Sequence, residues 1–345
     1  MGSSGLEHAN TQRRAIVSGL GGQDASFLVE LLTADGCDVH GVVARALPPW
    51  SADVDNAGAR VQQACAATTL HSGRDHEPAV LRRLLALIEP TEVYVLATTA
   101  GQSTIANCHQ SVLTVTRNWL RAIEDYESSV GQRVRFAVAV TAAVFGVGGA
   151  ALTESSPVQP NEPQAVAMAA AWDHVTRYRD VHGLHASVAI LFPHESERQS
   201  RAALSRKVTR AATRIRLGLQ PRVSLHGLDL KREWGYAADH VGALPRMAQQ
   251  HRADDYVIAT GDAHTTRGFV NQVFGRLGLD WRDHVEELPR PQDPSDAVEH
   301  SGDASKAHRK LAWNPALPFE VLVERMINCD IALARHEKRA NGPHG

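Results

Sequence analysis

The sequence predicts an α/β fold in which a doubly wound parallel sheet is followed by a smaller C-terminal segment. Three observations support this fold class. Apolar runs of strand length alternate with helical patterns in the first half, a glycine-rich turn follows the first run, and the alternation ends after Phe192. Parallel strands need crossover connections, and helices usually provide them. The alternation therefore predicts one sheet with helices on both faces.

The first strand, turn and helix form the most specific part of this pattern. The apolar run 15–17 leads into Gly19, Gly22 and Ala25 at G-x-x-G-x-x-A spacing, and a helical pattern follows. Glycines allow the backbone to approach a pyrophosphate, and the helix N-terminus offers free N–H groups and the positive end of its dipole. We expect a Rossmann-type dinucleotide site at Gly19, Gly22, Gln23, Asp24 and Ala25. An ordinary strand–helix turn is the alternative.

Further elements follow at regular intervals. Strands are expected at 39–44, 68–71, 92–97, 134–140 and 186–192, and helices at 79–87, 112–126 and 165–178. Later helices are expected at 205–217, 237–249, 265–277 and 319–337, with a strand at 256–259. The 205–217 helix is rich in arginine, which fits either a solvated face or contact with an anion.

Arg45 follows the second expected strand, where a dinucleotide fold meets the adenosine ribose. An acidic residue there selects a ribose 2′-hydroxyl, whereas arginine suits a 2′-phosphate. Arg45 therefore favours NADP over NAD as a possible cofactor. A solvated surface arginine is the other interpretation.

The composition narrows the class of protein. The chain has 345 residues, 43% of them hydrophobic and 21% charged, with a net charge of −2. This is typical of a globular protein and gives no basic field that would attract nucleic acid. No run of 18 apolar residues and no signal-peptide pattern occurs, so we expect a soluble, cytoplasmic protein without membrane contact. The 18 histidines and four cysteines show no metal-ligand spacing, so no metal site is expected.

The same patterns suggest a domain division. Residues 1–12 are expected to be a flexible leader and 13–192 a Rossmann-type dinucleotide-binding domain. Residues 193–337 are expected to form mainly a substrate-side domain, with 237–282 packing back on the Rossmann part, and 338–345 a tail.

Several short strings, in order along the chain, resemble the GDP-mannose 4,6-dehydratase family of extended short-chain dehydrogenases/reductases. The similarity runs from about Arg14 to Ala334. The strings are Gly22-Gln23-Asp24, residues 190–196 (ILFPHES), Arg206-Lys207, residues 231–235 (KREWG), 257–261 (VIATG) and 310–315 (KLAWNP).

This resemblance implies a Rossmann domain for NADP, a smaller C-terminal nucleotide-sugar domain, and homodimers or homotetramers. It also implies an internal redox cycle. A tyrosinate takes the C4 hydroxyl proton while hydride moves to NADP⁺, a glutamate assists loss of water across C5 and C6, and the hydride returns to C6. A lysine one helical turn after the tyrosine lowers the tyrosine pKa, since residues i and i+4 share a helix face.

The sequence departs from the family at these reacting groups. Gln164 stands at the tyrosine position, Met168 at the lysine position and Ala143 at the glutamate position, while Thr141 of the same family string is kept. Glutamine cannot form a phenolate, methionine carries no charge, and alanine has no acid–base group. Each lost acid–base group would cost roughly 10²–10⁴ in rate. Ordinary 4,6-dehydration is therefore not expected.

The expected binding residues are mixed. Lys207 and Arg232 match family positions that contact the substrate diphosphate, and Arg198 matches within the same substrate-side motif. Pro193 replaces a family asparagine, and Arg74 stands at the aspartate position that meets adenine. The resemblance thus implies a frame for a diphosphate with altered surroundings.

These observations favour a repurposed enzyme, lyase- or isomerase-like, acting without redox on a nucleotide-sugar or specialised-metabolite substrate by elimination, isomerisation or cyclisation. The candidate catalytic groups are Thr141, Gln164, His194 and Glu195. His194 and Glu195 also have a structural interpretation, because the family carries the same pair. Two alternatives stay open: a non-catalytic nucleotide-binding pseudoenzyme that partners an active dehydratase, and an atypical NADP-dependent nucleotide-sugar dehydratase.

Overall fold

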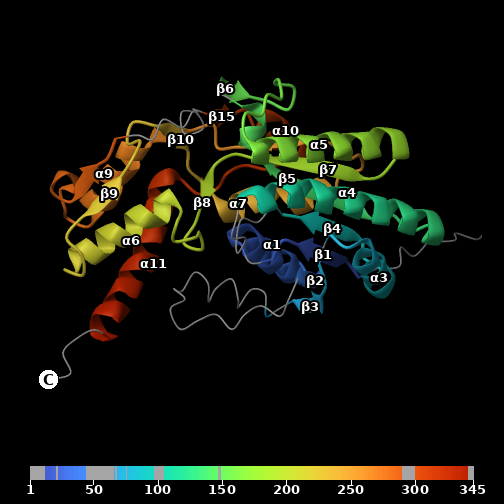
Figure 1. Ribbon diagram of the computed structural model, residues 1–345, viewed down its shortest axis with the longest axis horizontal. Helices are drawn as coiled ribbons and strands as arrows, with labels where there is room; N and C mark the ends of the chain where they lie inside the picture. The colour runs from blue at the N-terminus through green and yellow to red at the C-terminus, as the bar shows by residue number, and fades with distance from the viewer. Residues whose placement is uncertain are drawn as a thin grey trace, which may run out of the picture.

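A seven-stranded parallel sheet lies at the centre of the molecule (Figure 1), in the order β12-β7-β5-β4-β1-β2-β3. The computed structural model describes residues 12–20, 22–43, 66, 68–74, 76–96, 105–146, 149–289 and 300–340. The strands are β1 (Arg14–Ser18), β2 (Asp38–Val43), β3 (Thr69–Ser72), β4 (Glu92–Val95), β5 (Arg135–Thr141), β7 (Ala186–Leu191) and β12 (Tyr256–Ile258). Every neighbouring pair runs parallel. The predicted fold class, a doubly wound parallel sheet, is confirmed.

Helices cover the sheet as the alternation predicts. They are α1 (Gln23–Ala34), α3 (Pro78–Ile88), α4 (Ile105–Val130) and α5 (Pro163–His182). β4 and β7 are buried along their whole length, as expected of strands covered on both faces. Their sequences are mostly apolar, with Glu92 of β4 and Ser187 of β7 as buried polar residues. Helix ends follow local chemistry: α3 ends before Pro90, and α5 ends at the left-handed Gly183. α4 and α5 pack side by side.

The later part of the chain forms a second group of elements at one end of Figure 1. Helices α6 (Leu204–Arg216), α9 (Thr266–Arg276) and α11 (Phe319–Ala340) pack on one another there. Short strand pairs accompany them: β9 (Val223–Leu225) with β14 (Val285–Glu287), and β10 (Lys231–Glu233) with β13 (Ala263–Thr265). A short 3-10 turn, η2 (Trp281–Asp283), packs on α9 in this part. α10 (Ser305–Leu311) lies instead against β12 and α8, and β15 (His300–Gly302) pairs with β6 (Gly149–Leu152).

The prediction of a single helix over 237–249 is wrong, because the structure has two short helices there. α7 (Ala237–Val241) ends and α8 (Ala243–Ala248) begins at Gly242. Pro245 has no N–H to continue the α7 hydrogen-bond ladder, but it is tolerated in the first turn of a new helix. α7 packs on α1, and α8 packs on β5 and β7.

Two further findings concern membrane-spanning helices and clusters of metal-ligand side chains. Along the stretches of chain that the structure describes, no helix is both long and apolar enough to cross a bilayer. Within the same stretches, no three histidine, cysteine or carboxylate side chains gather as metal ligands would. Gly21, Arg45, residues 1–11 of the predicted leader and 341–345 of the predicted tail lie outside the described residues.

Candidate active site

The N-terminus of α1 forms the first part of the site. Gly19 has a φ of +92°, a conformation that favours glycine, and it turns the chain at the end of β1. Gly22 is the extended N-cap residue of α1 and, as a glycine, has no side chain of its own to cap the helix. Ala25 is fully buried behind this turn, where a larger side chain would not fit against the core. The first turn of α1 therefore presents uncapped N–H groups, which suit an anion.

Gln23 and Asp24, the next two residues of the motif, hold a neighbouring segment of the protein. The Oε1 atom of Gln23 accepts a 2.6 Å hydrogen bond from Ser196, and its Nε2 donates to the His194 carbonyl at 3.3 Å. Asp24 Oδ1 lies 3.0 Å from His194 Nε2. These contacts tie residues 194–196 to the start of α1, so Gln23 and Asp24 act first as a bridge between two parts of the chain.

The His194 side chain is 12% exposed and is held by this bridge. It opens β8 (His194–Glu195), which pairs with β11 (Gly235–Tyr236), and its Nδ1 contacts the Phe192 carbonyl at 2.7 Å. Burial alone would lower the pKa of His194, but the charge and hydrogen bond of Asp24 outweigh it and raise that pKa to about 9. The protonated ring donates from both nitrogens at neutral pH. A general base is therefore not available here until Asp24 is displaced.

A second histidine stacks on the first. The rings of His194 and His240 lie 4.8 Å apart, and His240 Nδ1 contacts the Tyr236 carbonyl at 3.2 Å. Burial and the neighbouring His194 charge hold the pKa of His240 well below its usual value. The pair is thus one cation stacked on one neutral ring. Gly235 is required for this packing, because a Cβ there would lie 2.1 Å from the His240 ring.

Glu195 faces the substrate-side elements. Its Oε2 accepts a 2.6 Å hydrogen bond from Ser205 of α6, and its Oε1 is paired with Arg232 of β10. The Arg232 guanidinium also lies over the Trp234 ring, 4.5 Å from its centre. Glu195 therefore orients Arg232, whose side chain keeps 30% of its surface exposed. That exposed part can still meet an anion.

Arg198 and Lys207, the other predicted substrate contacts, are placed differently. Arg198 stacks on Phe27 and binds the Glu30 carboxylate of α1 at 2.7 and 2.8 Å, with its side chain only 9% exposed. Lys207 is exposed, and its Nζ donates to the Ser224 carbonyl at 2.7 Å. Arg198 thus fastens the 194–198 segment to α1, and a ligand would have to displace Glu30 to reach its guanidinium.

The remaining candidates meet between β5 and α5. Thr141 is the exposed last residue of β5, and its hydroxyl donates to the Met168 sulfur at 3.4 Å. Met168 is 1% exposed, and Gln164 lies one helical turn before it on the same face of α5. Ala143 follows in the 3-10 turn η1 (Ala142–Phe145). The face formed by these four residues carries hydroxyl, amide, thioether and methyl groups, none of which ionises near neutral pH.

The family resemblance implies a bound dinucleotide, so its two halves can be compared with the N-terminus of α1 and with the face between β5 and α5. The uncapped first turn of α1 and the glycine at +92° fit a pyrophosphate. The Thr141–Met168 contact does not fit the redox end, because it offers neither a cation for a ribose nor a phenolate for a proton. At the adenine side, Arg74 lies 4.0 Å from Glu77. Among the residues that the structure describes, those at the start of α1 fit the phosphates of the cofactor, and those between β5 and α5 do not fit its redox end.

The contact between the start of α1 and residues 194–198 could not be predicted from the sequence. The partners lie about 170 positions apart, and no local spacing connects them. The charge pattern offered the only signal, since Asp24 and Glu30 on one side match His194 and Arg198 on the other.

The sheet, the helix N-terminus after β1 and the appended helical group define an extended short-chain dehydrogenase/reductase. A solved structure of dTDP-glucose 4,6-dehydratase from Bacillus anthracis, in complex with NAD, has this fold, with a TM-score of 0.76 at 17% identity over 95% of this chain and 97% of its own. More specifically, the chain belongs to the GDP-mannose 4,6-dehydratase family, whose model matches residues 16–326.

Individual relatives agree with this family assignment. GDP-mannose 4,6 dehydratase 1 of Arabidopsis thaliana is 36% identical, over 94% of this chain and 91% of that protein. The human GDP-mannose 4,6 dehydratase is 30% identical, over 98% and 97%. The similarity therefore extends across both groups of elements.

Proposed function

We propose that this protein is a member of the dehydratase family that no longer runs the internal redox cycle and performs non-redox chemistry on an anionic, nucleotide-linked or specialised-metabolite substrate. The observation that carries this proposal is the 3.4 Å contact between Thr141 and the buried Met168. The uncharged thioether of Met168 thus occupies the position that the family resemblance assigns to the lysine.

The chemistry of the β5–α5 face supports this function. Thr141 can donate and accept a hydrogen bond, and Gln164 can do both through its amide. Such groups orient a substrate and stabilise a developing oxyanion, but they do not remove a proton of high pKa at neutral pH. An elimination, isomerisation or cyclisation of a substrate that is already activated requires orientation above all.

Anchoring of the substrate comes from the other side of the site in this proposal. Arg232, oriented by Glu195 and Trp234, and the exposed Lys207 supply the positive charge for a diphosphate. His194 and Glu195 serve as positioning residues, because Asp24, Ser205 and Arg232 already engage them. In this proposal NADP bound at α1 would have a structural role through its phosphates and would not transfer a hydride.

In this proposal the protein is a cytoplasmic homodimer or homotetramer. It acts on a small molecule and has no nucleic-acid or membrane partner. A second candidate function is a nucleotide-binding subunit that pairs with an active dehydratase. The engagement of His194, Glu195 and Arg198 by other protein groups favours it, because such a frame would keep its shape without turning over a substrate.

Binding measurements separate these possibilities. Mass spectrometry of the purified protein under native conditions should find NADP or a guanine nucleotide bound, and added NADP should raise the unfolding temperature. No bound dinucleotide and no thermal shift would refute cofactor binding at α1. A stable complex with an active homologue that raises its turnover would favour the subunit function over the enzyme.

The pocket itself is tested by restoring the family residues. The combined variant Gln164→Tyr, Met168→Lys, Ala143→Glu should not recover dehydration of GDP-mannose, because the neighbouring groups also differ from the family. The matched control is Gln164→Glu, Met168→Leu, Ala143→Ser, which changes the same positions without an acid–base set of the family type. Product from the first variant alone would show that the pocket is otherwise intact and would refute repurposing.

A further inference from the structure

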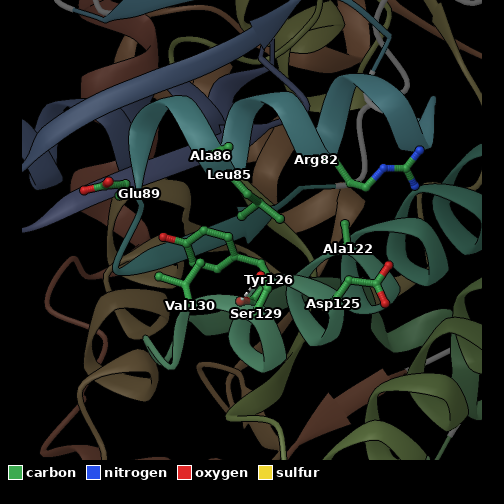
Figure 2. A pocket seen from close by; sticks show the side chains of 9 residues that line it. All are labelled: Arg82, Leu85, Ala86, Glu89, Ala122, Asp125, Tyr126, Ser129 and Val130. Atoms are coloured by element: carbon green, nitrogen blue, oxygen red, sulfur yellow. Dashed lines mark hydrogen bonds between the residues drawn. The ribbon is translucent and has the colours of Figure 1, made fainter.

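A groove of about 280 Å³ lies between α3 and α4, on parts of these helices that the candidate active site does not use (Figure 2). One helical stripe of α3 and one of α4 form its walls. The lining residues are Arg82, Leu85, Ala86, Glu89, Ala122, Asp125, Tyr126, Ser129 and Val130.

The groove exists because two facing positions carry small side chains. Ala86 of α3 and Ala122 of α4 leave a gap that larger side chains would fill, and Leu85, Ala122 and Tyr126 form its buried floor. Its volume exceeds the roughly 150 Å³ of an apolar cavity that binds benzene. A nucleotide sugar is too large for this space, whereas a single small aromatic molecule fits.

One end of the groove has an unused hydrogen-bond donor. Tyr126 is only 7% exposed, and no residue that the structure describes accepts a hydrogen bond from its hydroxyl. A buried hydroxyl without a partner is unfavourable, so a ligand acceptor there would gain binding energy. Burial, and then the charge of Glu89, raise the pKa of Tyr126, so the phenol keeps its proton at neutral pH.

The other end carries two opposite charges. Figure 2 shows Arg82 and Asp125 at one end of the groove, and Tyr126 with Glu89 towards the other. Arg82 and Asp125 are exposed, and neither forms an ion pair with any described residue. Glu89, in contrast, pairs with Arg14 at 3.2 Å. The open charges therefore comprise one cation and one anion, on opposite walls.

We propose that this groove binds a small aromatic α-amino acid with a hydroxyl on its ring, of which L-tyrosine is the test case. Arg82 binds the carboxylate, Asp125 binds the ammonium, the ring lies on Leu85 and Ala122, and the ring hydroxyl accepts from Tyr126. The wall from position 82 to 89 is roughly 10 Å long at 1.5 Å per residue, a length that this ligand spans. An apolar floor with polar groups at both ends is the usual form of a small-molecule site.

Calorimetry with four probes tests each contact. L-tyrosine should bind with a Kd of ~1 mM or tighter. L-phenylalanine lacks the ring hydroxyl, 4-hydroxyphenylacetate lacks the ammonium, and tyramine lacks the carboxylate, so each should bind more weakly. Arg82→Gln should weaken L-tyrosine and 4-hydroxyphenylacetate about tenfold and spare tyramine. Asp125→Asn should weaken L-tyrosine and tyramine and spare 4-hydroxyphenylacetate.

Two further variants test the groove and its donor. Tyr126→Phe should remove the advantage of L-tyrosine over L-phenylalanine, and Ala86→Leu should fill the groove and abolish binding of both. Arg83→Gln and Ser128→Ala, at exposed neighbouring positions that do not line the groove, should bind like the wild type. Circular dichroism confirms that each variant is folded.

The proposal is overturned if the wild type gives no heat with L-tyrosine at its solubility limit. It is equally overturned if Ala86→Leu, or Arg82→Gln and Asp125→Asn together, leave L-tyrosine binding unchanged. If one variant does not fold, the ranking of the four probes on the wild-type protein still decides the question.

Discussion

Replacing Asp255 by alanine should destabilise the protein strongly, because this carboxylate holds α5 against the sheet. Its two oxygens accept hydrogen bonds from Arg179 at 2.6 and 3.0 Å and from the Trp172 indole at 2.8 Å. The Val188 N–H of β7 donates to it at 3.2 Å. Asp255 thus joins one helix, one strand and its own segment, and α5 carries the face that contains Gln164.

The size of the effect follows from burial. Asp255 is 8% exposed and the Arg179 side chain 16%, so alanine would leave a nearly buried guanidinium and two buried N–H groups without their acceptor. Breaking a buried ion pair from one side costs about 3–5 kcal/mol. Arg179 has a second carboxylate, Asp180, at 3.4 Å, which offsets part of that loss. We therefore expect the lower end, about 3 kcal/mol.

Urea unfolding, followed by tryptophan fluorescence and by circular dichroism, measures this change. Asp254→Ala is the matched control: this neighbouring carboxylate is 46% exposed and pairs with Lys306 at 2.7 Å. Exposed pairs contribute up to about 1 kcal/mol. Equal losses for the two variants would refute the view that Asp255 clamps α5.

Three further predictions concern single residues. The pKa of His194 is raised to about 9 by Asp24, so its contribution, about 3 kcal/mol, is complete below pH 6.5 and is lost as the pH rises through 9. Unfolding of the Asp24→Asn variant should lack this dependence, and identical pH profiles would contradict the assignment. Ala312 ends α10 with a φ of +48°, so the Ala312→Gly variant should be about 0.5–1 kcal/mol more stable in urea unfolding, and a loss of stability would contradict this. Burial and then Glu92 raise the pKa of the Cys37 thiol to about 11, so native protein at pH 8 should resist thiol reagents at this position, and rapid labelling located there by peptide mapping would disprove it.

The parallel sheet could be predicted because most of its strands are separate runs rich in apolar residues, although the edge strand β3 has the sequence TLHS and is largely exposed. The β7 sequence, Ala186–Leu191, is buried at every position and is apolar apart from Ser187. The two-residue strands β8 and β11 gave no such signal, because two residues carry no period. Helix α4 extends further at both ends than its predicted core, since polar residues in its outer turns hid the pattern.

The candidate site could be predicted only in part. The glycine turn before α1 follows from motif spacing, whereas Arg232 is predicted only because it matches a position of the family that the chain resembles. The contacts that decide what these residues can do, such as Glu30 on Arg198 and Asp24 on His194, join positions about 170 residues apart. No single-sequence pattern reports such pairs, because they depend on how the 194–198 segment docks on α1.

Loss of the internal redox cycle is tested most directly by incubating the purified protein with GDP-mannose and NADP⁺ and analysing the products by mass spectrometry. The Arabidopsis relative, 36% identical, serves as a parallel sample in the same buffer. Because the Thr141–Met168 face holds no acid–base pair, GDP-mannose should be recovered unchanged. Formation of the 4-keto-6-deoxy sugar nucleotide, one water lighter than GDP-mannose, would contradict it.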